Sequence, residues 1–204
     1  SGTDYTAMQD ELRNKIKELH EAGIRKIIID ARNNTGGSPY MTMAILALFA
    51  PEGEHIMSAG GIIDEATGNF VRDAEGNYEI GGYLSYEGEN LWEDGEIILL
   101  VNAETVSAGD YLAYGMSSLE QVKLMGFTRS NGSGQAVRGI ELESGGLSFS
   151  TVPSMTPEGE ILIDSGKDHR NPIELDICVP FDKEVVTAIF DREEDYLLNQ
   201  AVEY

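Results

Sequence analysis

Two continuous apolar runs constrain the fold of this chain more than any other feature of its sequence. Residues 24–31 read IRKIIIDA and residues 96–102 read EIILLVN, so neither run alternates apolar and polar residues at its centre. A strand with one solvent-facing side alternates, whereas a strand in a sheet covered on both faces need not. A short loop and a helix-length segment follow each run. This order predicts an α/β domain.

The rest of the chain extends this pattern. Residues 4–22 carry apolar positions at helical spacing and predict an amphipathic helix, and residues 41–50 (MTMAILALFA) predict a core helix too short to span a bilayer. Further strands are predicted at 121–126, within 137–163 (AVRGIEL, LSFSTV and EILID) and at 173–180, with further helices from Ser107, at 182–190 and at 193–202.

The polar, Gly-rich residues 52–95 predict a β-hairpin insertion at the edge of the domain, less well buried than strands 26–31 and 97–101. With 204 residues, of which 41% are hydrophobic, the chain can bury one sizeable core. We therefore expect residues 1–204 to form a single domain.

The charge balance excludes two classes of partner. Lys and Arg number 14 against 36 Asp and Glu, a formal net charge of −22. Such a chain repels nucleic acid phosphates and anionic lipid, so neither nucleic acid binding nor membrane contact is expected. Cys178 is the only cysteine, which excludes an internal disulfide.

The segment ETVSAGDYLAYGM (104–116) places Ser107 between the second apolar run and a helix. One interpretation is that Thr105 or Ser107 caps this helix. The other is that Ser107 is a nucleophile on a strand-to-helix turn, with free backbone amides beside it. The segment by itself does not decide between them.

The segment IIIDARNNTGGSP (27–39) carries Gly36 and Gly37 after the first apolar run. Adjacent glycines adopt backbone conformations closed to other residues, so their amides can face a ligand; a tight turn is the alternative. Neither a dinucleotide fingerprint nor a phosphate-binding Gly-Lys-Ser/Thr is present.

Acid, base and metal candidates are few. Asp164, Asp168 and His169 lie in the segment 157–180, which could supply an acid or base or form a solvated turn. The other histidines are His20 and His55, and none has the spacing of a zinc helix. No metal or organic cofactor is implied.

Together these motifs resemble those of the tail-specific, or C-terminal processing, serine peptidases and their relative, the tricorn protease core. The resemblance covers roughly residues 10–182 and rests on the order Asp-x-Arg-x-Asn-x-Gly-Gly, then Ser-Ala-Gly-Asp, then a closing TPEGEILIDSGKD segment. The matching positions are Asp30, Arg32, Asn34, Gly36, Gly37, residues 107–110 and residues 156–168.

The resemblance implies a ClpP/crotonase-like spiral of βαβ units with Ser107 as the nucleophile of an endopeptidase. The amide of Ala108, with one from the Gly36–Gly37 turn, would form the oxyanion hole, so we expect that turn beside the Ser107 helix. The implied substrate is an extended or unfolded polypeptide. The implied location is outside the cytoplasm or at the cell envelope.

The general base departs from the family pattern. Tail-specific peptidases carry a lysine in a Gly-Lys-Gly loop, where this chain has Ser133 between two glycines. Lys123 lies on the preceding strand, and the tricorn branch takes a histidine from an upstream segment, with an acidic residue near the position of Asp164. We therefore expect no Lys or His of residues 1–204 to bond to Ser107, and the chain to be a catalytic fragment of a longer protein.

Two alternatives of other classes stay open. The chain could be a catalytically idle peptide-binding domain that keeps the groove and lacks the base. It could also be an acyl-CoA enzyme of the crotonase type, although no basic patch for the CoA phosphates is visible. The sequence leaves the oligomeric state open.

Overall fold

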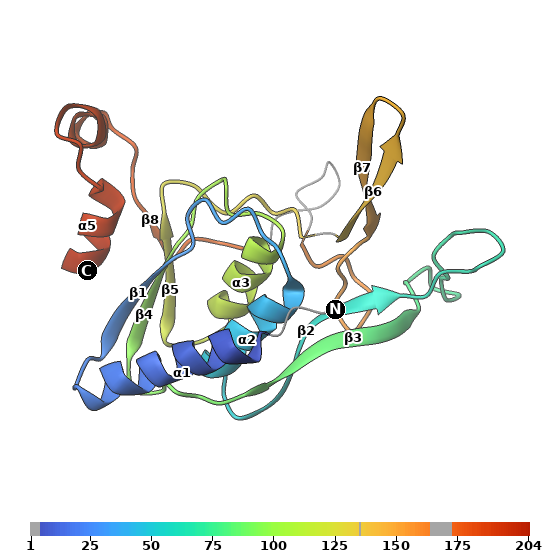
Figure 1. Cartoon of the computed structure of the whole chain (residues 1–204), viewed down its shortest axis with the longest axis horizontal. Coiled ribbons are helices and arrows are strands. Elements are labelled where there is room, and N and C mark those ends of the chain that lie inside the picture. Colours follow the sequence, from blue (N-terminus) through green and yellow to red (C-terminus); the bar gives the residue numbers. More distant parts are fainter. Residues whose placement is uncertain (1–4, 135, 164–172) are drawn as a thin grey trace.

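The centre of the protein is a parallel sheet of four strands. We describe a computed structural model, which covers residues 5–134, 136–163 and 173–204. The strand order is β1-β4-β5-β8, and every neighbouring pair is parallel (Figure 1). The strands span Lys26–Asp30, Glu96–Leu100, Val122–Gly126 and Ile177–Cys178. Successive βαβ units thus build the sheet, as the apolar runs predict.

The continuous apolar run of β4 is explained by cover on both faces of the sheet. Ile97 and Leu99 point into the larger core, which the helices α1, α2 and α3 cover, while Ile98 and Leu100 pack into a second core under α5. All four side chains are buried. In β1 the three isoleucines are only partly buried, because β1 lies at the edge of the sheet.

Three helices cover one face of the sheet and one covers the other (Figure 1). The ridges of α2 and α3 approach closely, since a Cβ added at Gly115 would lie 2.6 Å from Leu46 Cδ1. Both residues belong to the predicted helices, whose positions are confirmed. The four helices span Thr6–Glu21 (α1), Pro39–Phe49 (α2), Ala108–Ser117 (α3) and Tyr196–Glu203 (α5).

The predicted insertion is a long antiparallel pair, β2 (Gly53–Gly61) and β3 (Ile80–Gly88). Its outer residues, 62–79, are mostly exposed, so it is less well buried than β4, as expected. Strand β1 is itself only partly buried, so the difference in burial between the insertion and this edge strand is smaller than expected. Near the end of the insertion, Trp92 is fully buried and joins the larger core.

The C-terminal part differs from the prediction in two places. A separate hairpin, β6 (Ala136–Leu142) and β7 (Gly145–Val152), accounts for two of the strands expected there. Of the third, EILID, the described residues 160–163 form only an isolated bridge, between Ile161 and Met155. The last strand shortens to the two residues of β8, which pair with Met125 and Gly126.

Helical structure continues after β8 where it was expected. It comprises α4 (Lys183–Val186), a π-helical turn over Thr187–Asp191 and then α5. Among the described residues, no helix combines the length and the apolar character needed to cross a membrane.

Candidate active site

Ser107 occupies a strained turn between β4 and α3. Its backbone has φ +61° and ψ −117°, a conformation that residues with a side chain rarely adopt, and it is the N-cap of α3. We call Val106–Ala108 the elbow. Strained backbone of this kind persists only where its surroundings hold it, and it is concentrated at functional sites.

The N–H of Ala108 lies at the first position of α3. The first amides of a helix lack intrahelical acceptors and carry partial positive charge. No acceptor for this N–H is found among the residues that the structure describes. The elbow therefore presents an unused donor beside the Ser107 side chain.

The Gly36–Gly37 turn lies against the elbow, as the sequence predicts. A Cβ added at Gly36 would be 2.7 Å from Ser107 Cβ and 3.0 Å from the nitrogen of Ala108. The N–H of Gly36 donates to Asn34 Oδ1 at 2.9 Å and is already satisfied. Gly37, in contrast, borders open space, and no described residue accepts its N–H. The absence of a side chain at Gly36 allows the close approach, and Gly37 supplies the second free amide.

Backbone contacts fasten this turn to the elbow. The N–H of Val106 donates to Asn34 O at 2.9 Å. The elbow is also bonded to α2, where the side-chain hydroxyl of Thr42 donates to Ala108 O at 3.1 Å. Gly109 must lack a side chain as well, since a Cβ there would be 2.8 Å from Asn34 O. The Asn34–Gly37 loop and the elbow thus form one packed unit.

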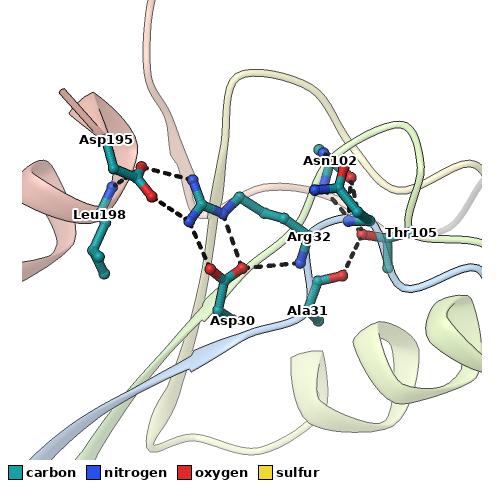
Figure 2. A network of polar contacts seen from close by, with 8 residues as sticks. Asp30, Ala31, Arg32, Asn102, Thr105, Asp195 and Leu198 are labelled. Carbon is teal, nitrogen blue, oxygen red and sulfur yellow. Dashed lines mark hydrogen bonds and ion pairs between the residues drawn. The ribbon is translucent and has the colours of Figure 1, made fainter. Parts of the chain in front are cut away.

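Two polar side chains join the loops that follow β1 and β4 (Figure 2). The hydroxyl of Thr105, which is fully buried, donates to Ala31 O at 2.9 Å. Asn102 Oδ1 accepts the N–H of Asn33 at 3.0 Å, and its amide nitrogen donates to Asn33 Oδ1 at 2.9 Å. These bonds fix the two loops to each other immediately before the elbow.

Arg32 is clamped between two carboxylates (Figure 2). Its guanidinium donates to both oxygens of Asp30 and to both oxygens of Asp195, at 2.6–2.9 Å. Arg32 holds the pKa of Asp30 and the pKa of Asp195 below their ordinary values, mainly through these side-chain hydrogen bonds. Asp195 also caps α5 by accepting the N–H of Leu198. The clamp ties α5 to the end of β1.

Asp110 connects the elbow to a third loop. Its buried carboxylate accepts the N–H of Ser107 at 3.0 Å, of Gly132 at 2.8 Å and of Ser133 at 2.9 Å. Because Ser107 and Ser133 donate to the same oxygen, Oδ2, their nitrogens lie less than about 6 Å apart. In the sequence, Asp110 is visible only as the last residue of the Ser-Ala-Gly-Asp motif. The Ser-x-x-Asp spacing of a capping box is the signal that could have identified its role.

No general base is found in the part of the chain described. Within it, no lysine or histidine side chain bonds to Ser107. Lys123 lies 3.7 Å from Asp176, His20 pairs with Asp94, and His55 bonds to Pro51 O. Asp164, Asp168 and His169, the acid–base candidates of the closing segment, fall outside the described residues.

A family model identifies the family of this chain. The model of peptidase family S41 matches residues 3–172. The chain belongs to this family. The serine peptidase resemblance drawn from the Asp30–Gly37 and Ser107–Asp110 motifs is therefore confirmed.

Similar proteins agree with this membership. The chain is 25% identical over 157 residues to a CtpA-like serine protease of Staphylococcus saprophyticus, covering 76% of this chain and 29% of that protein. It also resembles a CtpA-like serine protease of Staphylococcus aureus, at 22% identity over 167 residues, with 81% and 30% covered. The S41 chain thus spans less than a third of these relatives.

Solved structures show the same fold. The photosystem II D1 C-terminal processing protease aligns with a TM-score of 0.58 and 20% identity, over 86% of this chain and 40% of that one. Mature CPAF aligns with a TM-score of 0.63 and 16% identity, over 94% and 46%. The α/β fold class, a ClpP/crotonase-like spiral with a hairpin insertion, is confirmed.

The Asp110 contacts give a first prediction. Asp110→Asn replaces one carboxylate oxygen by an NH₂ group. Because both oxygens accept backbone N–H groups, at least one of these N–H groups then loses its acceptor. We expect the free energy of unfolding to fall by about 1–3 kcal/mol in urea titrations followed by circular dichroism. Asp64 is the matched control, because its exposed carboxylate also accepts backbone N–H groups. An equal loss in Asp64→Asn would contradict the structural role of Asp110.

The Arg32 clamp gives a second prediction. Since the pKa values of Asp30 and Asp195 are lowered in the folded state, their contribution to stability is present above the unfolded value of about 4 and is lost as the pH falls through the folded values. Arg32→Met should cost about 1 kcal/mol at pH 7, a modest figure because both carboxylates are partly exposed, and less near pH 2.

The measurement is the unfolding free energy of wild type and Arg32→Met between pH 2 and pH 7. Arg129→Met serves as the control, because it removes a surface pair with Glu174 that joins no helix to the sheet. A difference between wild type and Arg32→Met that does not change with pH would refute the clamp.

Proposed function

We propose that residues 1–204 form the catalytic core of a serine endopeptidase that hydrolyses extended or unfolded polypeptides. Ser107 would be the nucleophile, and the N–H groups of Ala108 and Gly37 would bind the oxyanion. The observation that carries this proposal is the strained elbow at the helix N-terminus, with Gly36 packed so closely that a Cβ added to it would lie 2.7 Å from Ser107 Cβ. S41 family membership supports peptide bond hydrolysis as the reaction.

The chemistry follows from this arrangement. Ser107 Oγ attacks the peptide carbonyl carbon and gives its proton to a base, and the carbonyl oxygen becomes an oxyanion between the two amides. The base then protonates the leaving amine, and water hydrolyses the acyl ester in the second half-reaction. Removing one oxyanion donor typically costs about 3 kcal/mol of transition-state stabilisation.

The base is proposed to lie outside residues 1–204. A serine hydroxyl is a weak nucleophile until a neighbour within about 3 Å accepts its proton. No described lysine or histidine does so, and Ser133 occupies the loop position where tail-specific peptidases carry their lysine. A histidine from another segment, oriented by Asp164, would complete the site. The location that the resemblance to the tail-specific peptidases implies, outside the cytoplasm or at the cell envelope, is part of this proposal.

A second candidate function rests on the same missing base. An idle domain of this fold would bind polypeptides in the groove and release them uncleaved. The contacts of Lys123 with Asp176 and of His20 with Asp94 favour it, because they occupy both side chains away from Ser107. Hydrolysis and binding measured side by side separate the two functions.

The nucleophile assignment is tested in the full-length gene product. We expect it to hydrolyse unfolded casein and Ser107→Ala to reduce kcat by about 10⁴-fold or more, while residues 1–204 alone show no turnover above background. Ser117→Ala is the control, since its exposed hydroxyl bonds to Tyr114 O at the other end of α3. Equal casein hydrolysis with and without Ser107 would refute the assignment. If the full-length protein and its Ser107→Ala variant both bind casein without hydrolysing it, the idle domain is established.

The close approach of Gly36 gives a separate prediction. A methyl group there collides with Ser107 Cβ and the Val106 carbonyl, so Gly36→Ala must displace the elbow, and we expect roughly a 100-fold loss of kcat. Gly23→Ala is the matched control: its φ of +83° carries the same backbone strain, but nothing lies within 4 Å of the added methyl. Similar kinetics for the two variants would show that strain alone, and not the collision, affects the site.

A further inference from the structure

A cavity of about 450 Å³ lies between the β2–β3 pair, α3 and the segment after β7. This volume is within the range of ligand-binding pockets, about 300–1,000 Å³. Every described residue that lines it is uncharged: serines, glycines, Ala59, Leu84, Pro153 and two tyrosines. None of these residues has a role in the mechanism given above.

One wall of the cavity is hydrogen-bonded to the elbow, and another is hydrogen-bonded to the residue that follows the Gly132–Ser133 loop. Tyr111, on one wall, lies one helical turn after Ser107, and its N–H donates to Ser107 O at 3.1 Å. Ser154, on another wall, donates its hydroxyl to Gly134 O. Gly134 follows Ser133, whose N–H shares an Asp110 oxygen with Ser107. The cavity therefore lies one helical turn along α3 from the candidate nucleophile, although Ser107 is not one of its described lining residues.

Two glycines provide the space. Gly60 and Gly82 are direct partners across β2 and β3, and a Cβ added to either meets no atom within 4 Å. Neither has a positive φ, so a side chain at either position would be free of backbone strain. The next pair on the same face of this antiparallel ladder is Ser58 and Leu84. The cavity is open because both strands carry glycine where they face α3.

Tyr111 closes the cavity on the side of α3. Burial raises the pKa of its phenol to about 12, an effect that the neighbouring Ser58 side chain partly offsets. The ring is therefore neutral at physiological pH and presents an apolar surface to the cavity. A charged side chain entering here would lose hydration and gain no opposite charge.

We propose that this cavity binds one bulky apolar or aromatic side chain of the polypeptide substrate, close to the scissile bond. This inference rests on the proposed function, because it takes the occupant to be the chain that Ser107 attacks. Gly60, Gly82 and Tyr111 are then the residues that set specificity. The two glycines leave room for the side chain, and the ring of Tyr111 contacts it.

The kinetic test fills the cavity from within. In the full-length protein, Gly82→Phe places a phenyl ring where the substrate side chain would lie. We expect the ratio of kcat/KM for a phenylalanine-containing peptide to that for its alanine analogue to fall roughly 10- to 200-fold. Gly139→Phe is the matched control, a β6 glycine with no atom within 4 Å of an added Cβ and no positive φ. An unchanged ratio in Gly82→Phe would overturn the proposal.

A second measurement needs no hydrolysis and separates this inference from the proposed function. A peptide carrying p-benzoylphenylalanine is photo-cross-linked to the Ser107→Ala variant, and the attachment sites are mapped by mass spectrometry. Cross-links within residues 58–61 or 81–84 that Gly82→Phe abolishes, and Gly139→Phe retains, support the cavity even if Ser107 proves dispensable for hydrolysis. Cross-links elsewhere refute it, even if Ser107 proves essential.

Discussion

The candidate site depends on the hydrogen bonds that the buried carboxylate of Asp110 accepts. This carboxylate accepts one N–H from the elbow and two from the Gly132–Ser133 loop, so one side chain holds together two segments far apart in the sequence. A buried carboxylate is stable only when donors replace its lost hydration. Three backbone amides do so here, and they fix the strained Ser107 backbone in return. The elbow and the loop are consequently one structural unit.

The parallel sheet brings the other parts of the site to the same edge. Asp30 and Leu100 end their strands in register, so the loops after β1 and β4 begin side by side (Figure 1). Thr105 and Asn102 then join these loops, and Gly36 allows the first to touch the elbow. The Arg32 clamp adds α5 to this edge. Ligand sites of open α/β sheets lie at the carboxyl ends of the strands for the same reason.

The sheet also explains why Lys123 is an unsuitable base. Lys123 is paired with Ile98 inside the ladder, whereas Ser107 lies beyond the carboxyl end of β4. Its ammonium group lies near Asp176, the residue before β8. Position 133, in contrast, is held less than about 6 Å from Ser107 between backbone nitrogens. The site is thus assembled around a position that carries a serine in this chain.

The sequence by itself determined the α/β class, the main helices, the hairpin insertion and the proximity of Gly36 to Ser107, because these follow from local periodicity and from motifs that the family shares. Only the tertiary structure showed that β1 is an edge strand, that the described residues 160–163 form no strand, and that Asp195 clamps Arg32. It alone revealed that the Gly132–Ser133 loop donates two N–H groups to Asp110, and that a cavity lies beside Gly60 and Gly82. Those features join residues distant in the chain, and local pattern carries no information about which distant segments meet.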